Sequence, residues 1–213
     1  MVETNGKIKL IYFYDALCGW CYGFSPVIAK IYANYQDRFE FEIISGGLKI
    51  GDAVGPIGVV APYIKAGAYR TVEERSGVRF GEAFVNGPLE EGTMILNSLP
   101  PGIALSIVKK NMPDRAFEFA SILHKAIYID GLHPEDLSGY GRYAEKIGLN
   151  SAEFVTNMQL SEFEKRTKQE FALSQQLGIR GFPTLIGVKA DSAFMITHGY
   201  EEYDLVAAKL DSL

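Results

Sequence analysis

The hydrophobic pattern changes period twice in the first 45 residues. Residues 8–14 are mostly apolar and rich in β-branched and aromatic side chains, which is typical of a buried strand. Between residues 22 and 35, large apolar side chains recur at spacings of three and four or close to them, which predicts a helix. Residues 39–44 alternate and then become fully apolar, which predicts a second strand. Strand, helix and strand form a βαβ unit, and its crossover is expected to be right-handed.

A long interval, from about residue 50 to residue 170, carries mostly helical patterns and no internal repeat. Asp114 and Ser151 precede two of its predicted helices and are expected to cap them. Two short strands and a closing helix are predicted after the interval. The expected elements are helices over residues 62–74, 101–111, 114–130, 135–147, 151–159 and 161–178, strands over 184–188 and 193–198, and a last helix over 201–210.

The composition is that of an ordinary globular protein, with 213 residues, 47% hydrophobic and 22% charged. This length fits one domain, or one domain with a large insertion. A chain of this length can bury a hydrophobic core without disulfides or a structural metal. A net charge of −5 and the lack of a basic block argue against nucleic-acid and membrane partners. The sequence shows no secretory signal and no membrane-spanning run, so we expect a cytoplasmic protein. Whether it is a monomer or a homodimer does not follow from the sequence.

The chain has two cysteines, Cys18 and Cys21, separated by two residues. A structural disulfide is disfavoured, because so short a loop adds little stability and the cytosol keeps thiols reduced. A zinc site needs four ligands, and the three histidines do not lie at zinc-finger spacing, so zinc would require a dimer. The favoured interpretation is a redox pair that cycles between dithiol and disulfide, with no metal and no organic cofactor.

The predicted elements place Cys18 where a strand ends and a helix begins. The first amides of a helix have no partners within it, and the helix dipole adds partial positive charge there. Both effects stabilise a thiolate, so Cys18 is the expected nucleophile. Cys21, one turn further along, is positioned to attack a mixed disulfide and release the product.

These residues resemble a known family. A C-x-x-C motif at the start of the helix of a βαβ unit is typical of thioredoxin-like proteins. The pattern D-x-x-C-x-W-C-Y-G, which starts at Asp15, resembles the DsbA family of thiol–disulfide oxidoreductases, and specifically its cytosolic FrnE-like branch. Pro26 resembles the helix-kinking proline of the same enzymes, and Gly19, Asp15 and Pro26 are therefore expected to support the site.

A second signature, G-x-x-G-F-P-T, runs from Gly178 to Thr184. It resembles the segment in which the family carries a cis-proline beside the active cysteines, which makes Pro183 the expected cis residue. A cis bond costs little before proline and forces a tight turn. On the same resemblance, Phe182 offers its backbone to a substrate strand. Trp20, between the cysteines, would dock substrate or shield the disulfide.

The resemblance implies an α/β, thioredoxin-like fold, with a central four-stranded mixed sheet flanked by helices and a large helical insertion. It divides the chain into a discontinuous thioredoxin-like domain, residues 1–50 and 170–213, and a helical insertion domain, residues 51–169.

The implied activity is thiol–disulfide oxidoreduction, with protein or small-molecule thiols and disulfides as partners and glutathione as a candidate co-substrate. Two alternatives stay open. One is a glutathione-dependent isomerase or transferase of the related 2-hydroxychromene-2-carboxylate isomerase or kappa-class type. The other is a non-enzymatic, chaperone-like binding module. The direction of the redox reaction does not follow from the sequence.

For several other residues, a purely structural role competes with a catalytic or binding role. Tyr12 stands six residues before the first cysteine, where thioredoxin-fold enzymes often bury an acid, so the proton acceptor for Cys21 is unassigned. Asp15 is a candidate for that role, although an acid near a strand end is more often a cap or a turn residue. His124 is expected in the core, and the glycine pair that begins at Gly46 is expected in a turn.

Overall fold

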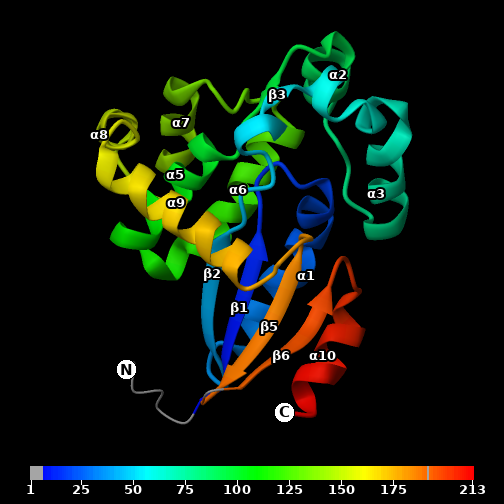
Figure 1. The fold of residues 1–213 in the computed structure, drawn as a ribbon, viewed down its shortest axis with the longest axis vertical. Helices are drawn as coiled ribbons and strands as arrows, with labels where there is room; N and C mark the ends of the chain where they lie inside the picture. The colour runs from blue at the N-terminus through cyan, green and yellow to red at the C-terminus, as the bar shows by residue number, and fades with distance from the viewer. Residues whose placement is uncertain (1–6, 191) are drawn as a thin grey trace.

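A mixed four-stranded sheet, in the order β2-β1-β5-β6, forms the centre of the fold (Figure 1). The computed structural model describes residues 7–190 and 192–213. Strand β1 (Lys9–Tyr14) pairs in parallel with β2 (Glu40–Ser45) and antiparallel with β5 (Thr184–Lys189). Strand β5 pairs antiparallel with the edge strand β6 (Ser192–His198). The sheet flanked by helices that the sequence predicts is confirmed.

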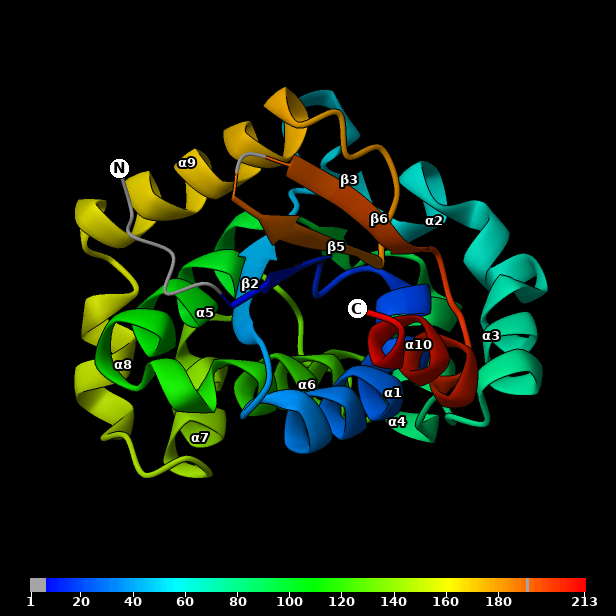
Figure 2. The ribbon, with the colours of Figure 1, turned by 90° about the horizontal axis from the view of Figure 1, so that it is seen from below.

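Helices cover both faces of this sheet. Figure 2 shows α1 (Gly19–Tyr35) and α10 (Tyr203–Asp211) on one side and α9 (Ser161–Gln176) on the other. The side of α1 that faces the sheet buries the apolar residues whose spacing predicts the helix, among them Phe24 and Ile31, both 0% exposed. Each such side chain contributes about 1.5–3 kcal/mol when fully buried. This packing fixes the start of α1 at the carboxyl end of β1.

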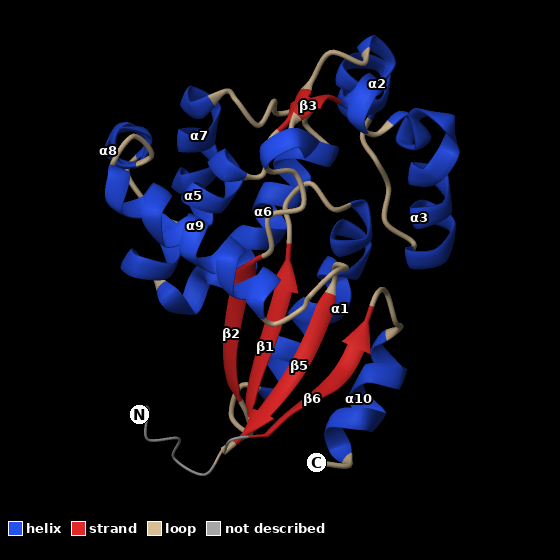
Figure 3. Ribbon diagram, viewed as in Figure 1, coloured by secondary structure: helices blue, strands red, loops and turns tan. Residues whose placement is uncertain are grey.

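The helical insertion lies between β2 and α9, above the carboxyl ends of β1 and β2, where Figure 3 shows its helices in blue. None of the helices in the described part of the chain is both long and apolar enough to cross a membrane. The domain boundary expected between residues 169 and 170 falls inside α9. The elements of the insertion are η1 (Gly51–Ala53), β3 (Gly55–Pro56), α2 (Ile57–Val60), η2 (Ile64–Ala68), α3 (Tyr69–Ser76), α4 (Glu82–Phe84), η3 (Val85–Leu89), β4 (Ile95–Leu96), α5 (Leu99–Asn111), η4 (Pro113–Arg115), α6 (Ala116–Tyr128), η5 (Leu137–Gly139), α7 (Tyr140–Glu145) and α8 (Ser151–Asn157).

The insertion departs from the sequence prediction at one glycine, at two caps and in its short elements. The helix expected over residues 135–147 is the turn η5 followed by α7, and the helical elements α4 and η3 were not predicted. The helix expected over residues 62–74 is interrupted at Gly67, whose φ of 127° is one that other residues rarely adopt. Asn150, and not Ser151, caps α8, because its side chain accepts a hydrogen bond from the backbone N–H of Glu153 at 2.9 Å. Asp114 lies in the short turn η4, and no side chain caps α6. The two-residue strands β3 and β4 were not predicted, because they are too short to show alternation.

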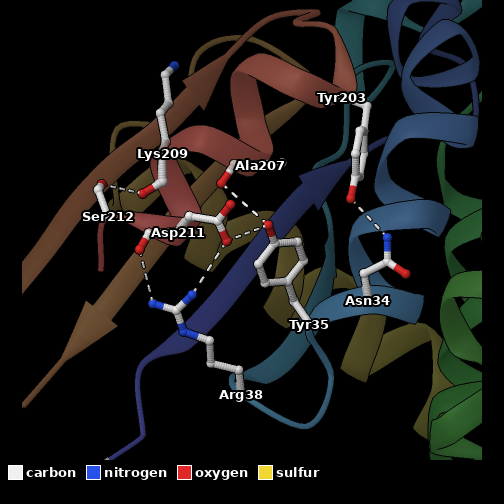
Figure 4. A network of polar contacts seen from close by, with 8 residues as sticks. All are labelled: Asn34, Tyr35, Arg38, Tyr203, Ala207, Lys209, Asp211 and Ser212. Carbon is white, nitrogen blue, oxygen red and sulfur yellow. Dashed lines mark hydrogen bonds and ion pairs between the residues drawn. The ribbon is translucent and has the colours of Figure 1, made fainter.

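A polar network fastens the last helix, α10, to the end of α1 that lies opposite the cysteines (Figure 4). The Tyr35 hydroxyl donates a hydrogen bond to Asp211 Oδ1 at 2.8 Å. Arg38 forms an ion pair with the same carboxylate at 3.6 Å, and Asn34 Nδ2 donates to the hydroxyl of Tyr203 at 2.8 Å. These contacts hold α1 as a rigid support for the residues at its amino end.

Candidate functional site

The two sequence signatures meet at the amino end of α1. Cys18 is the N-cap of this helix, and its Sγ accepts a hydrogen bond from the backbone N–H of Cys21 at 3.1 Å. The same thiol donates to the backbone carbonyl of Phe182 at 3.3 Å. The peptide bond between Phe182 and Pro183 is cis. The structure therefore brings together residues that lie 164 positions apart in the chain.

The two cysteines differ in accessibility. Both are free thiols, with Cys18 7% exposed and Cys21 0% exposed. Burial, followed by the hydrogen bond and the charge of the neighbouring Cys18, raises the pKa of the Cys21 thiol well above its ordinary value. An attacking molecule can therefore reach Cys18 and not Cys21. In the described residues, no group of three His, Cys, Asp or Glu side chains is placed to hold a metal ion.

Asp15 ties the active-site loop, residues 15–18, to the segment that follows β2 and to the insertion. Its carboxylate is 2% exposed. Oδ1 accepts hydrogen bonds from the backbone N–H of Leu17 at 2.9 Å and from the Ser98 hydroxyl at 3.0 Å, and Oδ2 accepts from the N–H of Leu48 at 2.8 Å. Burial raises the pKa of Asp15, and these hydrogen bonds oppose the rise. The carboxylate also contributes to the raised pKa of Cys21.

His124, from α6 of the insertion, contacts the same loop from the other side. Its Nε2 lies 3.2 Å from the backbone carbonyl of Asp15, and its Nδ1 lies 2.8 Å from the Ser25 hydroxyl. Burial lowers the pKa of His124 to about 4. The ring is therefore neutral at pH 7. Because a carbonyl can only accept, Nε2 carries the proton. The Nδ1 lone pair and the Cys21 carbonyl, which lies 3.0 Å from the Ser25 hydroxyl, then compete for the single proton of that hydroxyl. His124 lies in the core, as the sequence predicts.

Tyr12 occupies the position at which thioredoxin-fold enzymes often bury an acid, and it supplies no base. Its hydroxyl is buried and has no hydrogen-bond partner among the described residues. Burial, followed by the charges of Cys21 and Cys18, raises the pKa of Tyr12 well above its ordinary value. The phenol consequently stays protonated at neutral pH.

A glycine makes room for the ring of Phe182. A Cβ atom at Gly46 would lie 2.1 Å from that ring, so any larger residue at this position would force the ring to move. The following residue, Gly47, has a φ of 75°, which fits the turn expected from the sequence.

The remaining predicted residues surround the cysteines at different depths. Trp20 is half-buried and lies against Tyr200, with ring centroids 6.0 Å apart. Pro26 lies inside α1 on its exposed side. A Cβ atom at Gly19 would lie 3.8 Å from Phe80, which is ordinary contact distance. The lack of a side chain at Gly19 leaves open space beside Cys18.

That space is a cleft of about 210 Å³ beside the Cys18 thiol, which the sequence did not predict. One wall comes from the active-site loop, another from the segments around Leu48 and Phe182, and the third from the insertion. No sequence motif marks the insertion residues, because they meet only after folding. The residues that line the cleft are Leu17, Cys18, Gly19, Trp20, Leu48, Tyr63, Ile64, Ala68, Tyr69, Val72, Phe80, Tyr128 and Phe182.

Solved structures similar to this one cover nearly the whole chain. A candidate protein disulfide isomerase from Nitrosomonas europaea has 26% sequence identity and a TM-score of 0.84, over 97% of each chain. The cytosolic disulfide reductase DsbM from Pseudomonas aeruginosa, solved with GSH, has 22% identity and a TM-score of 0.76, over 96% of this chain and 98% of DsbM. A candidate DsbA oxidoreductase from Streptomyces coelicolor has 16% identity and a TM-score of 0.71, over 96% of this chain and 89% of that protein.

No protein-family model matches the chain, and no curated protein is significantly similar to it. The assignment therefore rests on structure. The structure has a mixed four-stranded sheet, a helical insertion between β2 and β5, and a C-x-x-C pair that faces a cis-proline. Together with these structural neighbours, they show that the chain has a thioredoxin-like fold with a helical insertion, similar to that of the candidate disulfide isomerase, DsbM and the candidate DsbA oxidoreductase.

Proposed function

We propose that this protein is a thiol–disulfide oxidoreductase that uses Cys18 as its nucleophile and Cys21 as its resolving thiol. The observation that carries the proposal is the hydrogen bonding of Cys18 Sγ, which accepts from the first turn of α1 and donates to the carbonyl of Phe182. Amides at a helix start favour a thiolate. The neighbours DsbM and the candidate disulfide isomerase and DsbA oxidoreductase support this class of reaction.

In the reductive direction, the Cys18 thiolate attacks one sulfur of a substrate disulfide. A bond forms between Cys18 Sγ and that sulfur, and the other substrate sulfur leaves as a thiolate that takes a proton from solvent. Loss of the Cys18 proton ends its hydrogen bond to the Phe182 carbonyl. That carbonyl is then available to accept from a backbone N–H of a peptide substrate, as in strand addition.

In the second step, Cys21 attacks Cys18 Sγ. The mixed disulfide breaks, the Cys18–Cys21 disulfide forms, and the second substrate sulfur leaves as a thiolate that takes up the proton lost by Cys21. Two electrons pass from the protein to the substrate. The same steps in reverse oxidise a substrate dithiol, and the reduction potential of the pair decides the direction.

The partners of this reaction are thiols and disulfides. The DsbM structure contains GSH, which supports a thiol partner for this chain as well. DsbM is described as cytosolic, which supports a cytoplasmic location and a dithiol resting state here.

The experiment that tests the proposal combines a redox titration with two variants. Equilibration in glutathione buffers, followed through the fluorescence of Trp20, should show reversible two-electron cycling of the wild type. Cys18→Ser should not cycle. Cys21→Ser should accumulate a mixed disulfide at Cys18, visible by mass spectrometry as the mass of one substrate thiol. A wild-type pair that cannot be cycled would contradict the proposal.

The same variants separate the two alternatives. A glutathione-dependent isomerase would keep its activity toward an aromatic substrate in Cys18→Ser. A chaperone-like module would suppress aggregation equally well after both cysteines are replaced by alanine. Either result, together with a pair that does not cycle, would replace the oxidoreductase interpretation.

A further inference from the structure

The hydroxyl of Tyr12 is a buried polar group that takes no part in either step of thiol exchange as written above. Tyr12 belongs to β1 and is 1% exposed. Its hydroxyl oxygen is buried and has no hydrogen-bond partner among the described residues. A buried hydroxyl without a partner costs free energy, and a phenylalanine would fill the same space without that cost. The resting protein therefore gains nothing from this hydroxyl.

Tyr12 packs against α1 at the level of Cys21. Its ring centroid lies 5.9 Å from that of Phe24. Phe24 follows Cys21 by three residues, which places it about one turn further along the same side of the helix. Tyr12 and Cys21 accordingly belong to one buried cluster. After burial, the charge of a Cys21 thiolate is the largest influence that raises the pKa of Tyr12, and the hydrogen bond which that thiolate would accept adds to it.

The Tyr12 hydroxyl can serve the thiol only as a donor. Because the phenol keeps its proton at neutral pH, it cannot take the proton of Cys21. A neutral thiol is a weak acceptor, whereas hydrogen bonds to charged groups are roughly twice as strong as neutral ones. The hydroxyl thus finds a good partner only while the Cys21 sulfur is negatively charged. That state is otherwise costly, since Cys21 is 0% exposed and burial raises the pKa of its thiol.

We propose that the Tyr12 hydroxyl donates a hydrogen bond to the Cys21 sulfur while that sulfur is a thiolate, and so accelerates resolution of the mixed disulfide. Cys21 loses its proton and attacks Cys18 Sγ, the bond between Cys18 and the substrate breaks, and the substrate sulfur leaves as a thiolate that takes up a proton. In the reverse direction Cys21 is the leaving thiolate, and the same donor stabilises it. Tyr12 keeps its proton throughout. The inference rests on the proposed function, because it concerns the resolving thiol.

The test uses Tyr12→Phe and the chromogenic disulfide dithionitrobenzoate. Attack by Cys18 releases the first equivalent of coloured nitrothiolate, and resolution by Cys21 releases the second. In stopped-flow measurements at pH 7, Tyr12→Phe should keep the wild-type rate of the first phase and slow the second about 10-fold. The ratio should be the same at every pH below the pKa of the Cys21 thiol, because each rate follows the fraction of thiolate.

Two equilibrium measurements separate this role from simple packing. Urea unfolding of reduced Tyr12→Phe should give a free energy of unfolding equal to or above that of the wild type, because no hydrogen bond of the resting protein is lost. The reduction potential at pH 7 should change little. Cys21 is protonated in the reduced protein, so the forward and reverse rates of its step change together.

Tyr32→Phe is the matched control. Tyr12 and Tyr32 both stack on Phe117, with ring centroids 6.2 Å and 4.8 Å away from it. Tyr32 lies roughly 16 Å further along α1 than Cys21, so its hydroxyl cannot reach the sulfur. This variant removes a hydroxyl from the same aromatic cluster and should keep the wild-type rates of both phases.

Each other outcome decides against the inference. A second phase of wild-type rate in Tyr12→Phe would overturn it and leave the proposed function intact. The same holds if both phases slow equally, if the variant unfolds more easily than the wild type, or if Tyr32→Phe slows the second phase as much. A wild-type protein that releases no second equivalent and cannot be cycled with dithiothreitol would overturn both the inference and the proposed function.

Discussion

Acidification from pH 7 to pH 5 is expected to destabilise this protein by about 2 kcal/mol through one side chain, His124. The ring is 1% exposed, and it lies between the Asp15 carbonyl and the Ser25 hydroxyl. Burial lowers its pKa from 6.5 to about 4 in the folded state. The unfolded chain therefore binds a proton at this residue before the folded protein does. The aromatic rings packed around His124 are those of Tyr14, Tyr22 and Tyr128.

The sign and the size of the effect follow from these two pKa values. Above pH 6.5 the ring is neutral in both states, and the full stability is present. As the pH falls from 6.5 to 4, only the unfolded state gains the proton, so the free energy of unfolding falls. At about 1.36 kcal/mol for each pH unit between the two values, the total loss approaches about 3.4 kcal/mol below pH 4. About 2 kcal/mol of this loss falls between pH 7 and pH 5.

The assay is urea unfolding of the reduced protein at pH 7, 6 and 5, followed by circular dichroism and compared with His124→Gln. Glutamine keeps an amide that can donate to the Asp15 carbonyl, and it does not titrate. Subtracting its pH dependence removes the contributions of carboxyl groups, including Asp15, whose raised pKa acts in the opposite sense at lower pH.

Equal losses of stability for the wild type and for His124→Gln between pH 7 and pH 5 would refute the reasoning. That result would mean that the ring binds a proton equally well in the folded and unfolded states. Direct NMR titration of the His124 ring gives an independent reading, and a midpoint near 6.5 would lead to the same conclusion.

Three further predictions concern the loop and the thiols. Gly46→Ala should slow disulfide exchange about 10- to 100-fold, because its Cβ would displace the Phe182 ring. In a double-mutant cycle with Phe182→Ala, the two effects should be clearly less than additive. Asp15→Asn should lower the free energy of unfolding by about 2–4 kcal/mol in urea, because an amide nitrogen would face hydrogen-bond donors that the carboxylate now satisfies. Iodoacetamide at pH 7 should modify Cys18 and leave Cys21 unmodified in the folded, reduced protein, because burial both shields the Cys21 thiol and raises its pKa. Mass spectrometry of peptides would reveal the contrary result, equal labelling of both.

The position of the C-x-x-C pair could be predicted from the sequence because it depends on local pattern. An apolar run followed by a helical period places Cys18 at a strand–helix junction, and the structure makes it the N-cap of α1. The strands and long helices were predictable for the same reason, since burial on one face imposes a period of 2 or 3.6 on neighbouring residues. Prediction failed at Gly67 and at the cap of α8, where one residue's backbone conformation or hydrogen bond decides the outcome.

The surroundings of the thiols were not predictable in this way. Ser98 donates to Asp15 across 83 residues, and His124 reaches the same loop across 109. The sequence around neither residue indicates this contact. A serine shortly before two prolines, such as Ser98, and a histidine on the apolar face of a helix, such as His124, occur in many structural roles.

The sequence by itself determined the four strands of the main sheet and the long helices, the nucleophile at the start of a helix and, through its resemblance to a family, the proline segment that faces it. Only the tertiary structure decided which thiol is accessible and which hydrogen bonds the buried side chains of Asp15 and His124 form. It also decided that an uncharged cleft opens beside Cys18. The physical reason is that burial, desolvation and cavity shape are set by side chains from segments far apart in the chain. Their effect on a thiol, a carboxyl or an imidazole exists only once those segments have packed together.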